Sequence, residues 1–240
     1  MTNLNITLPT CWQELTPKQL RYVFYLIGEG YSPEAVKTYC FFRWSNMEVV
    51  EAYGDGYTIR YEFNLHHLTA LQVAESLCHL AWLDSVPTVP IRLAVVDGHR
   101  AKDADLSGIP FEQYIVCDNL YQGYLHTQND DLLQQMAAIL YECETIRTTK
   151  EERINVFYWF AAVKGLFARK FTHLFTTNTK SVSSDMEREL LDRMNAQIRA
   201  LTKGDITKEK EVLAMDVWRA LTELDAQAAD YEELQKEMRK

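Results

Sequence analysis

The chain lacks an excess of positive charge. Its 240 residues include 25 lysines and arginines against 34 aspartates and glutamates, for a formal net charge of −9. A direct count assigns −5 of this charge to residues 1–184 and −4 to residues 185–240. Because proteins that bind nucleic acid neutralise phosphates with lysine and arginine, neither part offers a suitable surface. We therefore expect no nucleic-acid partner.

Paired cysteines are also missing. The five cysteines lie 26 to 39 residues apart, their number is odd, and no two of them form a CxxC motif. The first ten residues, MTNLNITLPT, lack the basic and apolar regions of a signal peptide. These absences predict reduced, mostly buried thiols and a cytoplasmic protein.

No apolar run is long enough for a membrane anchor. The segment from Ile154 to Phe171 is rich in aromatic residues, but Lys164 interrupts it and two further cations lie at its end. A spanning helix requires roughly 20 predominantly apolar residues. We interpret the segment as a central core helix with a capping box of Thr149 and Glu152. The alternative is a helix lying in a membrane interface, and no membrane partner is expected.

Motifs of catalysis and cofactor binding are absent as well. The sequence contains no GxGxxG, no P-loop, no HExxH and no GxSxG. The candidate metal ligands are His66, His67, Cys78 and His79. Adjacent histidines on an extended segment point to opposite sides, and no second compact ligand pair exists. We therefore predict neither a metal nor a cofactor.

The candidate nucleophile is Cys117, which stands beside Asp118. His126 follows nine residues later on the same predicted helix. At that separation the thiol and the imidazole should not meet, so we expect a buried core cysteine. No catalytic residue is predicted.

The sequence does contain a mixture of helical and strand patterns. Apolar residues recur at helical spacing in segments 17–28, 33 onwards, 68–83, 110–125 and 130–141. Thr16 with Pro17 and Gln19, and Ser32 with Pro33, predict the N-caps of the first two helices. Alternating or β-rich patterns predict strands over 3–9 and 91–96 and a hairpin around Gly54 to Gly56. The predicted fold is α+β and predominantly helical, with a small, largely antiparallel sheet packed on helices and a C-terminal helical hairpin.

Composition predicts three parts along the chain. Residues 1–175 form an α+β core domain, and residues 176–183 form a polar linker with little core-forming content. Residues 184–240 form the helical hairpin.

Apolar residues at heptad spacing in this hairpin are the strongest pattern in the sequence. The first helix carries them at Leu191, Met194, Ile198 and Leu201, and the second at Val217, Leu221, Leu224, Ala228 and Tyr231. The second helix, predicted over 208–239, has about 32 residues and a length of roughly 48 Å. Because this exceeds what the first helix can cover, part of its seam packs on the core domain or meets another chain.

The seam therefore predicts a surface for a protein partner. Its residues are Val217, Trp218, Leu221, Leu224, Ala228, Tyr231 and Met238, with Trp218 beside the seam as an anchor. The alternative is a hairpin that packs entirely on its own core.

Three segments resemble a known family. IPFEQYIVCDNLYQGYL at 109–125, FYWFAAVKGLFARKF at 157–171 and IRALTKGDITKEKEVLAMDVWRALTELDAQ at 198–227 are similar to tailed-phage and prophage proteins from tail-morphogenesis gene clusters. The similarity covers most of the chain. It implies a role in phage assembly in the host cytoplasm, such as a tail assembly chaperone that holds apolar helices of a tail component. The family offers no catalytic or binding residues to carry over.

The seam and the resemblance lead to one functional hypothesis. We expect a non-enzymatic phage or prophage assembly factor whose partner is a protein, specifically a tail component. A structural virion component, either a connector or a capsid-associated protein, is the alternative. An enzyme with a site gathered from distant residues is the third class. The sequence leaves open whether the chain forms a homo-oligomer.

Overall fold

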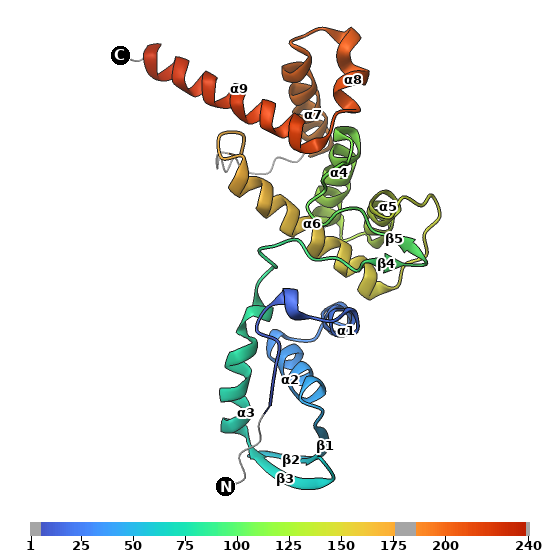
Figure 1. Cartoon of the computed structure of the whole chain (residues 1–240), viewed down its shortest axis with the longest axis vertical. Coiled ribbons are helices and arrows are strands. Elements are labelled where there is room, and N and C mark those ends of the chain that lie inside the picture. The colour runs from blue at the N-terminus through green and yellow to red at the C-terminus, as the bar shows by residue number, and fades with distance from the viewer. Residues whose placement is uncertain (1–5, 176–185, 239–240) are drawn as a thin grey trace. The chain divides into compact units, whose positions relative to one another are not determined.

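The fold is α+β and mostly helical, as predicted. The computed structural model describes residues 6–175 and 186–238 (Figure 1). Helices account for most of these residues, and the strands form a three-stranded and a two-stranded antiparallel sheet.

The chain divides into two compact units that are interleaved in sequence. The first comprises Met1–Pro87 and Thr149–Tyr158, and the second comprises Thr88–Thr148 and Trp159–Lys240. The C-terminal helices belong to the same unit as residues 88–148. The predicted linker falls outside the described residues.

In the first unit, two helices begin at the N-cap residues that the sequence predicts. Helix α1 (Pro17–Gly28) follows Thr16, whose hydroxyl accepts a hydrogen bond from the Gln19 amide at 3.3 Å. The Gln19 side chain accepts in return from the Thr16 amide at 2.9 Å. Helix α2 (Pro33–Trp44) follows Ser32, which caps it in the same way with its hydroxyl. Both capping predictions are confirmed.

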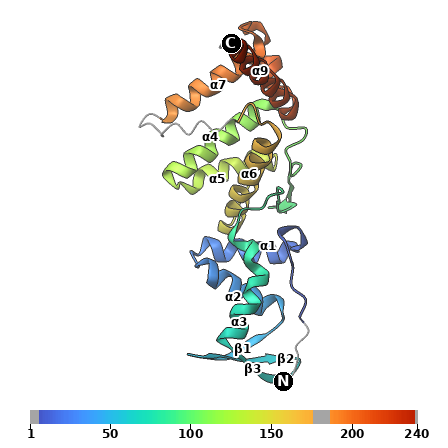
Figure 2. The same cartoon turned by 90° about the vertical axis from the view of Figure 1, so that its left-hand side faces the viewer.

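A three-stranded antiparallel sheet follows these helices. Strands β1 (Glu48–Tyr53), β2 (Gly56–Tyr61) and β3 (Asn64–Thr69) lie in that order. Figure 2 shows the sheet at the bottom of the view, below helices α1 and α2. The predicted hairpin is confirmed as the β1–β2 pair. Strand β3 was not predicted, and it pairs with β2 along its whole length.

The helix predicted over 68–83 is wrong in its start and its continuity. Strand β3 extends to Thr69, which caps helix α3 (Ala70–Leu77) through a capping box with Gln72. The chain then tightens into the 3₁₀ helix η2 (Cys78–Asp84). Pairing with β2 therefore overrides the helical spacing at the start of this segment.

Both isolated strand predictions also need correction. Residues 6–9 form no strand, and the rest of the predicted strand 3–9 lies outside the described residues. In the second unit, the predicted strand 91–96 is reduced to β4 (Val95–Val96), which pairs with β5 (His99–Arg100). Upstream of β4, the Leu93 carbonyl accepts a hydrogen bond from the Tyr141 hydroxyl at 2.8 Å instead of joining a sheet.

Helix α6 (Lys150–Lys170) supplies much of the apolar core of the second unit. The side chains of Trp159, Phe160, Val163 and Phe167 are all fully buried, which confirms the predicted core helix. At its start, the Glu152 carboxylate accepts from the Thr149 amide at 2.9 Å, as a capping box requires.

Two further helices of this unit match their predictions closely. These are α4 (Phe111–Thr127) and α5 (Asp130–Leu140), and they contact each other. No helix within the described ranges has the length and apolar character needed to cross a membrane.

The C-terminal region contains more elements than a hairpin. Helix α7 (Met186–Thr202) is followed by the 3₁₀ helix η3 (Ile206–Lys208), the short helix α8 (Glu209–Leu213) and the long helix α9 (Val217–Met238). Helix α7 contacts both α8 and α9.

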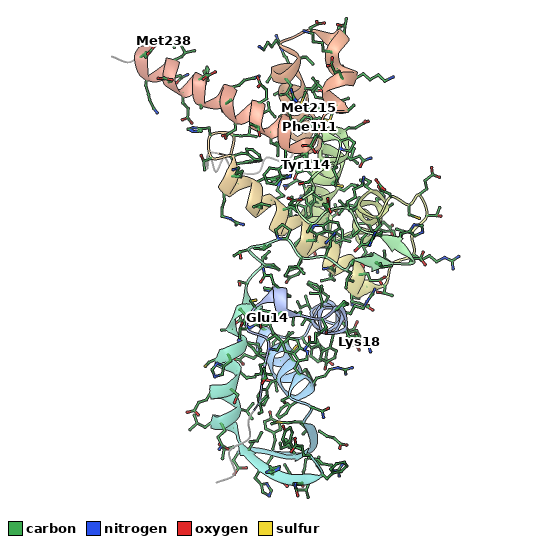
Figure 3. The ribbon with its side chains drawn as sticks, in the orientation of Figure 1. Glu14, Lys18, Phe111, Tyr114, Met215 and Met238 are labelled. Carbon is green, nitrogen blue, oxygen red and sulfur yellow. The ribbon has the colours of Figure 1, made fainter. Side chains whose placement is uncertain are left out.

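The break between α8 and α9 shows that the predicted single helix over 208–239 is wrong. The Phe111 amide donates a hydrogen bond to the Met215 carbonyl at 2.7 Å, and the Val217 amide donates to the Ile109 carbonyl at 2.9 Å. These bonds hold the chain in an extended bridge beside the start of α4. Figure 3 shows Met215 next to Phe111. A tertiary contact therefore interrupts a segment whose spacing is helical throughout.

Candidate interaction surface on helix α9

Asp216 caps helix α9 and ties its start to the second unit. Its carboxylate accepts hydrogen bonds from the amides of Trp218 at 3.0 Å and Arg219 at 3.2 Å. It also accepts from the Gly108 amide, 2.8 Å away and far off in the sequence. One side chain thus satisfies the free N–H groups of a helix end and fixes the helix in place.

The first half of α9 is buried in the core of its own unit. Val217, Ala220 and Leu221 have 0% exposure and Leu224 has 4%. Three of the residues predicted to contact a partner, Val217, Leu221 and Leu224, therefore pack against their own chain. In this structure they stabilise the fold and are not accessible to a second protein.

Trp218 also anchors α9 to its own unit. Its ring meets those of Phe167 and Phe171 edge-on, with centroids 5.2 and 5.7 Å apart. Its Nε1 donates to the Asp105 carbonyl at 2.9 Å. The predicted anchor residue thus joins α9 to α6 and to the loop before α4.

The middle of α9 is held by the segment that follows α6. The Asp225 carboxylate accepts from the amides of His173 and Leu174, both at 2.8 Å. The His173 Nδ1 lies 3.2 Å from a carboxylate oxygen of Glu232. These contacts fix the orientation of the helix as far as Glu232.

The last two turns of α9 carry an exposed apolar stripe. Tyr231, Leu234 and Met238 are 62%, 57% and 78% exposed, and their spacing of three and four residues places them on one helix face. Figure 3 shows Met238 at the far end of the helix. Ala228, at the inner end of the stripe, is half-buried. We call Tyr231, Leu234 and Met238 the distal stripe.

Sequence reasoning predicted Tyr231 and Met238 for this surface but missed Leu234. Continuing the heptad from Leu224 through Tyr231 places Gln235 in the seam. The Gln235 side chain instead donates a hydrogen bond to the Tyr231 hydroxyl at 2.7 Å. The usable signal was that residues 231, 234 and 238 also follow steps of three and four, in a second register that shares Tyr231 and Met238 with the seam and replaces Gln235 by Leu234.

Negative charge surrounds the distal stripe. Residues 225–238 contain five carboxylates and one cation, Lys236, for a net charge of −4. Asp230 and Glu237 are exposed beside the stripe, four residues before and three residues after Leu234. A partner helix with an apolar face and flanking lysines or arginines would complement both features.

The candidate metal ligands are not brought together. His66 and His67 are consecutive residues of β3, and the His67 Nδ1 lies 3.1 Å from the Thr58 hydroxyl. Cys78 and His79 are both exposed in η2. Within residues 6–175 and 186–238, no three histidine, cysteine, aspartate or glutamate side chains lie close enough to hold a metal ion.

Cys117 is a buried core cysteine, as predicted. Burial, and secondarily the charge of Asp118, raises the pKa of its thiol to about 12. A thiol with this pKa stays protonated at neutral pH and is a poor nucleophile. His126 lies at the end of the same helix with its side chain exposed.

Thiol labelling should separate the cysteines by burial. Cys78 is exposed, whereas burial raises the pKa of the Cys40 thiol to about 12, against the opposing effect of Arg43. With Ellman's reagent at pH 8, we expect Cys78 to react rapidly in the native protein. Cys40 and Cys117 should react only after denaturation, as followed by absorbance and peptide mass. Native-state labelling of either buried thiol at the rate of Cys78 would contradict this packing.

Comparison of the chain with protein-family models, curated proteins and solved structures finds no match.

Proposed function

We propose that this protein is a non-enzymatic assembly factor that binds a partner protein through the distal half of α9. The observation that carries the proposal is the distal stripe, which exposes three large apolar side chains at the end of a helix whose first half is firmly anchored. Such a helix presents its apolar side chains without having to fold first. Preorganisation of this kind lowers the entropy cost of binding.

The chemistry of the stripe defines the partner. An amphipathic helix can lay its apolar face against Tyr231, Leu234 and Met238 while its cations pair with the surrounding carboxylates. Each fully buried side chain contributes roughly 1.5–3 kcal/mol, and part of this offsets the cost of association. We therefore expect an affinity in the micromolar range, weakened by salt.

The resemblance to proteins of phage tail-morphogenesis clusters supplies the biological context. An assembly chaperone that holds a helical tail component before polymerisation needs a reversible contact of moderate strength. A small anchored stripe suits this need better than an extensive obligate interface. The partner proposed on this basis is a phage tail component in the host cytoplasm.

Affinity capture with a stripe variant tests the proposal. The variant carries Tyr231→Ser, Leu234→Ser and Met238→Ser, and all three side chains are exposed, so its thermal unfolding should match the wild type. In cells in which the encoding phage or prophage is induced, the wild type should capture a tail component. The variant should recover at least tenfold less of that component by quantitative mass spectrometry.

A matched control carries three serines on other faces of the same helix. Ala226, Glu233 and Lys236 are exposed, and replacing the last two together leaves the net charge unchanged. This control should capture the component as the wild type does. Equal capture by the stripe variant would overturn the proposal.

A structural virion component is the second candidate, because it would use the same surface permanently. Mass spectrometry of purified particles separates the two roles. An assembly chaperone is absent from finished particles, whereas a connector or capsid-associated protein is present in them.

A further inference from the structure

The β2–β3 hairpin of the first unit ends in an unusual turn. The last pair of the ladder is Tyr61 with Asn64, so Glu62 and Phe63 form a two-residue turn. Both have positive φ, at 46° and 67°. Two-residue turns with this geometry favour asparagine, aspartate and glycine, and a bulky residue there is a genuine outlier.

The Phe63 side chain itself does not offset this strain through contacts with its own chain. The Phe63 side chain is 101% exposed, so its ring buries no surface against its own chain, and Leu65 beside it is 62% exposed. A strained residue persists where its conformation serves a role. An aromatic ring held clear of its own fold at a hairpin tip is suited to insertion into another molecule.

The same unit carries a depression suited to such a ring. It has a volume of about 660 Å³ and lies between α1, α2 and the start of β1. Aromatic and apolar side chains dominate its lining, including Tyr22, Tyr39, Phe42, Met47 and Tyr57. The ring centroids of Phe42 and Tyr57 lie 5.0 Å apart, which gives the depression an aromatic wall.

Arg43 adds a cation to this lining. Its guanidinium carbon lies 4.3 Å from the centroid of the Tyr22 ring. Its side chain is exposed, and no carboxylate of the described residues pairs with it. Glu48, the acidic residue of the lining, is paired with Arg60 at 2.5 Å. The depression therefore combines an aromatic wall with an available cation.

We infer that the hairpin tip of one copy of this chain docks into the depression of a second copy, with Phe63 against the aromatic wall and Glu62 paired with Arg43. Tip and depression are complementary in chemistry, because an exposed aromatic ring and a carboxylate at the tip match an aromatic wall and a cation in the depression. The Phe63 ring is stabilised by an apolar pocket, and the Glu62 carboxylate beside it is stabilised by a cation at the rim of that pocket.

The placement of the two features favours a closed dimer. Glu48, at the edge of the depression, pairs with Arg60, two residues before Glu62 at the tip. Tip and depression thus lie at the same end of the sheet. Two copies related by a two-fold axis can therefore exchange both contacts at once, which closes the assembly. This surface is independent of the distal stripe and of the proposed function.

Sedimentation velocity of the full chain over a range of concentrations tests the inference. The wild type should dimerise reversibly, and Phe63→Asn should weaken dimerisation at least tenfold. Asparagine accepts positive φ, so this variant should melt at the same or a higher temperature than the wild type under conditions where both are monomeric. Leu71→Ser removes another exposed apolar side chain of the unit and should leave dimerisation unchanged.

A charge exchange makes the test specific to the contact. Glu62→Arg and Arg43→Glu should each weaken the dimer, and the double variant should restore it. A wild type that is monomeric at all concentrations, a dimer insensitive to Phe63→Asn, or a double variant without recovery would overturn the inference. Loss of the dimer in the distal-stripe variant would also overturn it, because self-association would then belong to α9.

Discussion

Replacing Leu221 by alanine is expected to lower the free energy of unfolding by about 2–5 kcal/mol. Leu221 has 0% exposure, and its neighbours on the same face of α9, Val217 and Leu224, are also buried. Removing its branched end leaves a cavity in a core that is tied down by the Asp216 cap. Urea denaturation followed by circular dichroism measures the loss.

The matched control is a leucine-to-alanine substitution in the exposed half of α9, at Leu234. Leu234 is 57% exposed, so Leu234→Ala should change the free energy of unfolding by no more than about 0.5 kcal/mol. If the two substitutions cost the same, the division of α9 into a buried and an exposed half is wrong.

Replacing Gly56 by alanine should destabilise the first unit by about 3 kcal/mol or more. A Cβ atom at this position would stand 2.2 Å from the carbonyl oxygen of Leu68 and 3.0 Å from the Cα of Thr69. Both are backbone atoms of β3, so they cannot move without opening the β2–β3 ladder. Thermal unfolding and amide hydrogen exchange of residues 56–69 measure the effect.

Gly54 provides the control for this prediction. It lies in the β1–β2 turn, two residues before Gly56, and a Cβ atom there would meet nothing within 4 Å. Gly54→Ala should therefore leave stability nearly unchanged. A Gly56→Ala protein as stable as the Gly54→Ala protein would contradict the strand register described here.

Much of the local structure was predictable because its determinants are close in sequence. Thr16 with Gln19 and Ser32 with Pro33 mark helix starts that depend on side chains within one turn. Helix α6 was recognisable because its apolar residues cover most of its circumference. Such signals do not depend on the remainder of the fold.

The failures lie where distant segments decide the local structure. The helical spacing of residues 208–239 is continuous, yet bonds from segment 109–111 to Met215 and Val217 break the helix. Strand β3 was missed because its residues form a strand only once β2 is beside them. Leu93 lies in an apolar run that is typical of a strand. Nothing in the sequence reveals that its carbonyl accepts a hydrogen bond from the Tyr141 hydroxyl instead.

The candidate surface was predicted only in part, because contacts with distant segments also decide which residues of α9 are exposed. A heptad pattern shows which residues share a face, but not where burial of that face ends. Burial ends after Leu224, so Tyr231 and Met238 are exposed while Val217 and Leu221 are not. The turn at Phe63 gave no signal, because neither of its two central residues, Glu62 and Phe63, is the asparagine or glycine typical of such turns.

Site-specific photo-crosslinking tests the central claim most directly. A photoreactive amino acid is placed at position 234 in the distal stripe or, as a control, at position 236 on another face of α9, in cells in which the encoding phage or prophage is induced. The account predicts that position 234 forms a crosslink to a phage tail component and that position 236 does not. Equal crosslinking at both positions, or none at position 234, would contradict the assignment of this stripe as the partner-binding surface.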